Sequence, residues 1–195
     1  DGEYDVAGFI VGAVERAHLI DGRTISSGDV LIGLPSSGLH TNGYSLARRV
    51  AFEVAGLNVN DMVPELGTTI GDALLRSHRS YLPVIRPLLG RGLVKGMAHI
   101  TGGGITDNLP RILPEGCGAV VDRNAWEVPA VFNWLQRQGG VPDDDMLRTF
   151  NMGIGLIVIS ARNDADAVIG TLAGAGEPGA RRIGEIQDGV GVRYA

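Results

Sequence analysis

The clearest pattern of apolar and polar positions lies between residues 30 and 55. An apolar run from Val30 to Leu34 has strand character and ends at Pro35. A polar, glycine-bearing stretch follows over residues 36–43, and apolar residues then recur at helical spacing. That apolar face comprises Leu46, Ala47, Val50, Ala51, Val54 and Ala55. The pattern predicts a buried strand, a loop and a helix in direct succession.

Other runs extend this picture along the chain. Apolar stretches predict strands over residues 94–100, 118–122, 152–160, 182–187 and 190–194. Helical patterns cover residues 72–89, 106–113, 128–138 and 164–173, and a further helix opens at the three aspartates 143–145. Pro129 suits a first helical turn, Gly139 a C-terminal cap and Asn163 an N-terminal cap. Because strands and helices mix without strict alternation, we expect an α+β or three-layer α/β/α domain rather than a doubly wound fold.

The loop after the first strand is a candidate anion site. A strand, a glycine-bearing polar loop and a helix N-terminus aim free backbone N–H groups and a positive dipole at one point. Such a point commonly holds a phosphate. Ser37, His40, Thr41 and Asn42 add side chains that can bond a ligand, and the sequence contains no Walker or GxGxxG spacing here. Two alternatives stay open: Gly38 and Gly43 serve only tight turns, and Thr41 or Asn42 only caps the helix.

A second loop, with three consecutive glycines, lies at residues 102–104. Gly102, Gly103 and Gly104 suit a place where a side chain would block a ligand or a facing backbone, and Asn108 follows closely. His99, within an apolar strand, is expected to be a core histidine, and Asp107 a helix N-terminal carboxylate. Later in the chain, Arg148 and Asn151 are plausible pocket residues, whereas Gly153 and Gly155 favour tight packing.

Composition and charge limit which partners the protein can bind and which cellular compartment suits it. The 195 residues carry a net charge of -5 at a pI near 5.3, which argues against nucleic acid or an anionic membrane as a partner. The 30 glycines are about twice the usual share and cluster after apolar runs. The single Cys117 fits a reducing, cytoplasmic setting, and four scattered histidines give no zinc spacing, so we expect no metal site. No apolar run is long enough for a membrane helix.

The first residues suggest a domain boundary. Residues 5–14 have the character of a buried strand, which needs neighbours on both sides, and residues 21–29 resemble a turn and linker. We therefore expect residues 1–20 to be the last strand or linker of a preceding domain, and residues 21–195 to form a C-terminal α/β domain. The alternative, that this strand joins the sheet of the second domain, stays open.

Four motifs in order carry a family resemblance that spans nearly the whole chain. They read SSGLHTNGYSL, HITGGGITDNLPRILP, FNWLQ and RTFNMGIGLIV. Together they resemble the C-terminal half of the phosphoribosylformylglycinamidine cyclo-ligases, also called aminoimidazole ribonucleotide synthetases. The opening DVAGFIVGAVE resembles the strand before the interdomain linker of that family. The chain departs from the family after Leu74 and Leu75, where Arg79 and Tyr81 match but Ser77, His78 and Ser80 do not.

The resemblance implies a fold, a reaction and partners. It implies a mixed three-layer α/β/α domain in a homodimeric enzyme that closes the imidazole ring of formylglycinamidine ribonucleotide. ATP activates the formyl amide oxygen, an amidine nitrogen attacks, and phosphate leaves. ATP and Mg²⁺ would be held mainly by an N-terminal half, whose DGVGTK motif does not occur in these 195 residues. The isolated chain is therefore expected to be inactive.

The substrate-binding residues that we predict lie on the two glycine loops. They are Ser37, Gly38, Thr41, Asn42, Gly43, Tyr44, Ser45, Gly102, Gly103, Gly104 and Asn108. His40 is the candidate catalytic group, because a histidine exchanges protons near neutral pH, although a structural histidine is an equal alternative. We expect both loops on one side of the sheet, flanking one cleft. Two other functions stay open, a related ATP-dependent synthetase or kinase and a non-catalytic nucleotide-binding module.

Overall fold

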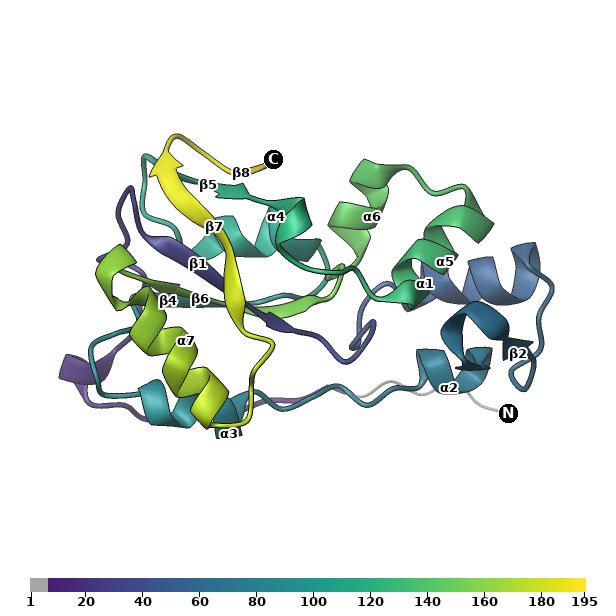
Figure 1. The fold of residues 1–195 in the computed structure, drawn as a ribbon, viewed down its shortest axis with the longest axis horizontal. Coiled ribbons are helices and arrows are strands. Elements are labelled where there is room, and N and C mark those ends of the chain that lie inside the picture. The colour runs from purple at the N-terminus through teal and green to yellow at the C-terminus, as the bar shows by residue number, and fades with distance from the viewer. Residues whose placement is uncertain (1–6) are drawn as a thin grey trace.

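The computed structural model describes residues 7–195 and contains one six-stranded mixed sheet with helices on both faces (Figure 1). The strands of this sheet lie in the order β4-β6-β1-β7-β5-β8, and a separate two-stranded ribbon pairs β2 with β3. All neighbours in the large sheet are antiparallel except β5 and β8. The strands are β1 (Val30–Pro35), β2 (Met62–Val63), β3 (Thr68–Thr69), β4 (Gly96–His99), β5 (Cys117–Val121), β6 (Ile154–Ser160), β7 (Arg181–Asp188) and β8 (Val192–Tyr194).

The helices are short and several continue as single turns of another type. The α-helices are α1 (Tyr44–Arg48), α2 (Ile70–Leu74), α3 (Leu82–Ile85), α4 (Gly104–Asn108), α5 (Ala130–Gly139), α6 (Asp143–Thr149) and α7 (Ala165–Gly174). A π-helix, Arg49–Val54, extends α1. The 3-10 turns are Arg16–His18, Pro64–Leu66, Arg86–Leu88, Leu109–Ile112, Arg123–Ala125 and Arg162–Asp164. None of the helices in residues 7–195 is both long and apolar enough to cross a membrane.

The two faces of the sheet are buried against different helices. On β1, Val30, Ile32 and Leu34 pack with α3 and α7, while Leu31 points to the opposite layer with α4. Every residue of the neighbouring strand β6 is buried. Because a strand covered on both faces is apolar throughout, β1 and β6 appear in the sequence as continuous apolar runs. This arrangement confirms the predicted α+β class and the three layers.

A third apolar cluster fills the helical part of the molecule, where α1, α2, α5 and α6 lie beyond the ends of the strands (Figure 1). The cluster contains Phe132 and Leu135 from α5 and Phe150 from the segment after α6, all almost fully buried. The ring centroids of Phe132 and Phe150 are 5.7 Å apart in a tilted arrangement. The helical part is therefore a packed unit, and the loop after β1 crosses from the sheet into it.

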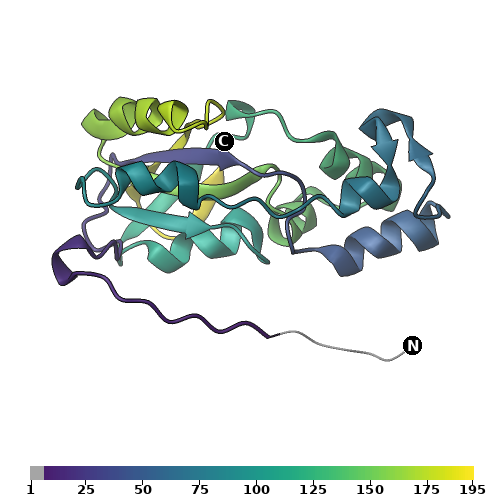
Figure 2. The same ribbon diagram turned by 90° about the horizontal axis from the view of Figure 1, so that it is seen from below.

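Three predictions of secondary structure are wrong. Residues 7–15 contain no strand and are exposed along an extended path outside the body (Figure 2), and the part of the predicted strand before residue 7 lies outside the described residues. The helix predicted over residues 72–89 is interrupted between α2 and α3, because a polar run separates them and prolines open each new turn. The predicted helix caps are wrong by one residue: the C-terminal cap of α5 is Gly140, at φ 57°, rather than Gly139, and the N-cap of α7 is Asp164, without a side-chain hydrogen bond, rather than Asn163.

Candidate functional site

The loop between β1 and α1 is held by one buried amide, that of Asn151. Asn151 Nδ2 donates to the carbonyl oxygens of Gly38 at 2.9 Å and Leu39 at 3.2 Å. Its Oδ1 accepts from Ser36 Oγ at 2.9 Å and from the Gly153 N–H at 2.8 Å. Asn151 is only 3% exposed. The side chain that the sequence marked as a pocket candidate therefore fixes the shape of the loop.

The carbonyls of Gly38, Leu39 and Gly43 accept hydrogen bonds, whereas the N–H groups of this loop are largely free. The Ser37 N–H donates to His40 Nε2 at 3.1 Å. Within residues 7–195, the N–H groups from Gly38 to Gly43 find no acceptor. Unpaired N–H groups ahead of a helix are the ones that bind anions. The backbone arrangement thus suits the predicted anion site.

Side-chain capping does not explain the polar residues of the loop. The N-cap of α1 is Gly43, at φ 78°, and no side chain caps that helix end. A Cβ at Gly43 would overlap the ring of Phe150, so packing as well as backbone angle requires glycine. Tyr44 donates its hydroxyl to the Leu74 carbonyl. The alternative that Thr41 or Asn42 serves as a cap is therefore wrong, and the Asn42 side chain is left for other contacts.

A cavity of about 150 Å³ opens beside the loop. Its lining combines the loop with α2, α5 and the ribbon: Ser36, Ser37, Gly38, Leu66, Thr68, Ala73, Arg76, Pro129, Ala130 and Val131. Arg76 is exposed and forms no ion pair with any residue that the structure describes. Drug-sized ligands fill about 300–1,000 Å³, so this cavity alone fits a phosphate-sized part of a ligand. A free guanidinium at its rim favours an anionic one.

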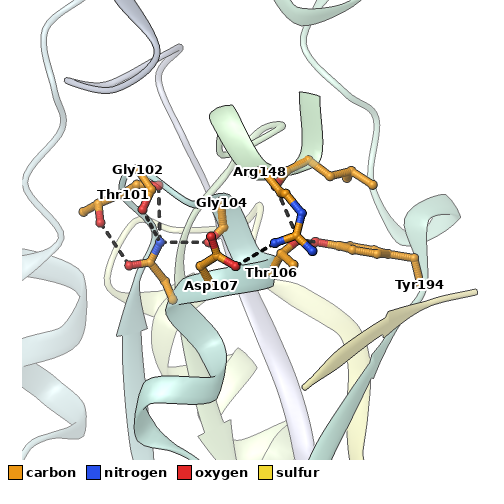
Figure 3. A network of polar contacts seen from close by, with 9 residues as sticks. Thr101, Gly102, Gly104, Thr106, Asp107, Arg148 and Tyr194 are labelled. Carbon is orange, nitrogen blue, oxygen red and sulfur yellow. Dashed lines mark hydrogen bonds and ion pairs between the residues drawn. The ribbon is translucent and has the colours of Figure 1, made fainter. Parts of the chain in front are cut away.

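The second glycine loop is tied to itself by Asn108. The amide nitrogen of Asn108 donates to the carbonyls of Gly102 at 3.1 Å and Gly104 at 2.8 Å, and its Oδ1 accepts from Thr101 Oγ1 at 3.0 Å. Thr101, Gly102 and Gly104 gather around this amide at the start of α4 (Figure 3). Asn108 is 5% exposed. These contacts give Asn108 a positioning role, and a direct contact with substrate stays a prediction.

The glycines of this loop differ in what surrounds them. A Cβ at Gly104 would overlap the Leu147 carbonyl oxygen, and one at Gly103 would lie 2.7 Å from Cβ of Asp107. At Gly102 the nearest atom to such a Cβ is Asn42 Oδ1, at 3.5 Å. The two loops therefore approach each other at Asn42 and Gly102. Both leave the same end of the sheet, because β1 and β4 flank β6 and run in the same direction. This confirms that the loops lie on one side of the sheet, and the shared cleft stays a prediction.

Beyond α4, polar contacts join the second loop to α6 and the C-terminus. Asp107 accepts from Arg148 Nη1 at 3.0 Å, and Thr106 and Tyr194 share a hydrogen bond of 2.9 Å (Figure 3). Arg148 and Asp107 are about half exposed, so their pair contributes little to stability. The pairing directs the Arg148 guanidinium to Asp107, and its place in a pocket stays a prediction.

Three histidines meet where these segments converge. His40 and His78 stack with ring centroids 4.0 Å apart, and His78 Nε2 lies 3.1 Å from His99 Nε2. Burial, followed by the charges of His78, His99 and Arg79, lowers the pKa of His40 to about 4. Burial and His99 lower the pKa of His78 as well. His40 is therefore a neutral imidazole at neutral pH.

The segment between α2 and α3 holds His78 in place through its neighbours. Arg79 Nη1 and the Tyr81 hydroxyl both donate to the Pro35 carbonyl, at 3.1 and 2.8 Å. Arg79 also forms an ion pair with Glu177, which is 4% exposed, and lies over the Tyr81 ring at 4.9 Å. Burial raises the pKa of Tyr81. These contacts attach the segment to the end of β1, next to the loop of residues 36–43, which we call the anion loop.

The structure corrects the prediction for His99. The side chain is exposed at the end of β4 rather than buried in the core, because Gly96 and Ala98 take the inward positions of this strand. Sequence reasoning also missed His78 and Arg76, which lie in the interrupted stretch after α2. Their only signal was the departure from the family pattern around residues 76–80.

A family model for the AIR synthase related protein, C-terminal domain, matches residues 26–194. The chain belongs to this family. The match includes both glycine loops, the three clustered histidines and the whole six-stranded sheet.

Curated relatives carry the name of a ring-closing ligase. The phosphoribosylformylglycinamidine cyclo-ligase of Desulfitobacterium hafniense is 56% identical over 177 residues, covering 91% of this chain and 51% of that protein. The chloroplastic enzyme of the same name from Arabidopsis thaliana is 45% identical over 194 residues, 49% of its length. The chain thus spans about half the length of the curated relatives that it matches.

Solved structures share the fold at low sequence identity. The thiamine-monophosphate kinase of Stenotrophomonas maltophilia K279a has a TM-score of 0.62 at 20% identity, covering 93% of this chain and 54% of that one. The hydrogenase maturation protein HypE of E. coli has a TM-score of 0.55 at 23% identity, covering 89% and 48%. At these identities the likeness concerns the fold alone.

Proposed function

We propose that this chain is the C-terminal domain of a phosphoribosylformylglycinamidine cyclo-ligase of purine biosynthesis. Identity of 45–56% to enzymes of that name over nearly the whole chain supports the proposal. In the reaction, ATP transfers a phosphoryl group to the formyl amide oxygen and ADP leaves. An amidine nitrogen then forms the ring C–N bond. Phosphate departs with the former amide oxygen, and the attacking nitrogen gives up its proton.

The anion loop is the observation that carries this function. The substrate bears a ribose phosphate, and both reacting groups belong to the substrates, so the protein must mainly position them and stabilise charge. The free N–H groups of residues 38–43, with Arg76 at the rim of the adjoining cavity, suit one phosphate group. Asn42, the residue of this loop whose side chain lies next to Gly102, is placed to bond the part of the substrate that extends toward the second loop.

His40 is proposed as the group that orients the substrate or moves a proton. Its lowered pKa keeps the ring neutral, so at neutral pH it acts through a ring N–H or a lone pair rather than as a cation. Because Nε2 accepts the Ser37 N–H, the ring proton lies on Nδ1. His40 thereby links the geometry of the anion loop to the histidine group.

ATP is proposed to bind mainly outside these residues, in the part of the relatives that the match does not cover. The described residues do not fit Mg²⁺, which prefers carboxylate and carbonyl oxygens. Among residues 7–195, the one group of three potential ligands consists of histidines. By the same reasoning we propose that the isolated chain does not turn over.

Two broader proposals follow from the same assignment. The complete enzyme is proposed to be a homodimer, as the family resemblance implies. We propose a reducing compartment such as the cytoplasm, because Cys117 is a free, partly buried thiol; a chloroplastic relative exists in Arabidopsis thaliana.

Calorimetric titration of the 195-residue chain with formylglycinamidine ribonucleotide tests the proposal. We expect binding of the substrate, little or no binding of ATP, and no turnover with both present. Arg76→Ala should weaken substrate binding about 10- to 100-fold, the range of a charge-assisted hydrogen bond. The exposed Arg23→Ala, whose guanidinium pairs with Asp21 away from the cavity, is the matched control.

The possible results separate the alternatives. Absence of substrate binding at millimolar concentration would contradict the cyclo-ligase assignment. Tight ATP binding without substrate binding would favour a nucleotide-binding module. Clear turnover by the chain alone would refute the proposal that it is inactive.

A further inference from the structure

Three of the four histidines of this chain form one group. His40 comes from the loop after β1, His78 from the segment between α2 and α3, and His99 from the end of β4. One ring nitrogen from each lies within 4.8 Å of the others. In the part of the chain that the structure describes, no other three His, Cys, Asp or Glu side chains are arranged in this way. What this group can bind does not depend on the proposed function.

The distance between two of the rings matches that between ligands of one metal ion. His78 Nε2 and His99 Nε2 are 3.1 Å apart. Two imidazole nitrogens bound to a tetrahedral metal at about 2.0–2.1 Å lie about 3.3–3.4 Å from each other. Without a metal, the same contact is one N–H···N hydrogen bond. The two Nε2 atoms are therefore already close to the separation that a shared ion requires.

The surroundings leave the required nitrogen atoms available. Thr41 Oγ1 lies 3.4 Å from His78 Nδ1, so the hydroxyl oxygen can accept from Nδ1 in the tautomer of His78 whose Nε2 carries the lone pair. His40 Nδ1 is buried and has no hydrogen-bond partner among residues 7–195. A buried polar atom without a partner is uncommon, and in the other tautomer of His40 this atom offers a lone pair to a ligand. Binding through this atom moves the ring proton to Nε2, so the Ser37 N–H must give up its contact there.

One rearrangement is needed before all three rings can bind together. His40 and His78 are stacked, with an interplanar angle of 15°. Ligand lone pairs lie in the ring plane, so two stacked rings do not converge on one ion. His78 lies in an irregular segment and is only half-buried, so its ring can turn while His40 and His99 keep their places.

We propose that His40, His78 and His99 bind one divalent transition-metal ion of the Zn²⁺ or Co²⁺ type. Imidazole ligands favour such ions over Mg²⁺ and Ca²⁺, which prefer oxygen. Three protein ligands leave a fourth coordination position open. Because Thr41 and Ser37 contact two of these rings, a metal here borders the anion loop.

The experiment uses the 195-residue chain without a histidine tag, stripped with chelator and titrated with Zn²⁺ alone and with Co²⁺ alone. We expect one ion per chain and the visible absorption of tetrahedral Co²⁺. His78→Gln and His99→Gln should each weaken binding at least 10- to 100-fold, since even outer-shell changes around a metal have effects of that size. His18→Gln, which alters the histidine outside the group, should bind as the parent does.

Both test side chains are accessible, so the variants should fold, and circular dichroism checks this. Stoichiometric binding that His78→Gln and His99→Gln both weaken supports the site. Failure of the parent chain to bind either ion at micromolar concentration overturns the proposal. Binding that is unchanged in both variants, or that is lost in His18→Gln, also overturns it.

Discussion

Replacement of Asn151 by alanine should destabilise the fold through the loop after β1. The amide forms four hydrogen bonds, two to the carbonyls of Gly38 and Leu39 and two from Ser36 and Gly153. It is 3% exposed, so water does not already compete for these groups. Alanine removes all four bonds and leaves backbone groups of the loop without partners.

The size of the effect follows from these contacts. A typical hydrogen bond contributes about 0.5–1.5 kcal/mol, and a buried group left unpaired costs about 1–3 kcal/mol. Because part of the loop can turn toward solvent, we expect a loss of about 2–4 kcal/mol in the free energy of unfolding. For a chain of this length that corresponds to a melting temperature lower by about 4–16 °C.

The assay combines denaturant unfolding with amide hydrogen exchange. Asn151→Ala should accelerate exchange selectively over residues 36–43 and at Gly153. Asn151→Asp keeps both accepting contacts but faces two carbonyls with a carboxylate, so it should be destabilised as well. The exposed Asn163→Ala should stay within about 0.5 kcal/mol of the parent. An Asn151→Ala chain as stable as this control would show that the amide does not hold the loop.

Three further substitutions test other parts of the structure. Asn42→Ala should change the unfolding free energy by less than about 0.5 kcal/mol, since no side chain caps α1, and should weaken substrate binding in calorimetry. A lower melting temperature with unchanged substrate binding would refute the assignment of Asn42 to the site. Gly104→Ala should lower the free energy of unfolding by more than about 3 kcal/mol in denaturant, because its Cβ would overlap the Leu147 carbonyl at φ 60°; near-parent stability would contradict this packing. Lys95→Met should lower the free energy of unfolding by about 3–5 kcal/mol, because it leaves the buried carboxylate of Asp29 without its cation. Arg23→Met removes the cation of an exposed ion pair, and an equally small effect of both variants would refute this prediction.

Local patterns were sufficient for the elements whose apolar residues are contiguous or periodic. The segments β1, β6, α5 and α7 appear where residues 30–34, 152–160, 128–138 and 164–173 predicted them, with shifted ends. An apolar run such as β6 needs no knowledge of its neighbours, because burial on both faces imposes the same composition on every position.

The partners of each strand could not be predicted from the local sequence. Only residues 189–191 separate β7 from β8, yet β8 pairs in parallel with β5 rather than with β7. Partner choice depends on which sheet edge is free, and the sequence around the turn carries no information about that edge. For residues 7–14, apolar composition predicted a strand where the structure has an exposed extended segment.

The histidine group was hidden for a similar reason. Metal-ligand motifs are recognised by short spacings on one element, whereas His40, His78 and His99 come from three segments far apart in the chain. They meet because β1 and β4 both pair with β6, with Pro35 opposite Ile154 and His99 opposite Leu156. Only strand order and register bring the two loop ends together.

The structure shows which glycines of the two loops are required by the packing of the protein itself and which are not. The sequence alone could not make this distinction. Gly43 and Gly104 are required by neighbouring protein atoms, the Phe150 ring and the Leu147 carbonyl. Gly38 is required by its backbone, at φ 151°, although a Cβ there would meet only the Arg76 side chain, at an ordinary contact distance of 3.6 Å. Gly102 has neither constraint, since a Cβ there would meet only Asn42 Oδ1, at an ordinary contact distance of 3.5 Å.

Gly102 is therefore the position at which a small side chain reports on a ligand rather than on the fold. Gly102→Ala should leave the free energy of unfolding within about 0.5–1 kcal/mol of the parent, because nothing in the structure opposes a methyl group there. If the substrate passes between Asn42 and Gly102, the same methyl group should weaken substrate binding in calorimetry. Gly90→Ala is unsuitable as a control because its φ is 74°, whereas Gly170→Ala adds a methyl group to open space on α7. Equal substrate binding by Gly102→Ala and Gly170→Ala would place the ligand path away from the second loop.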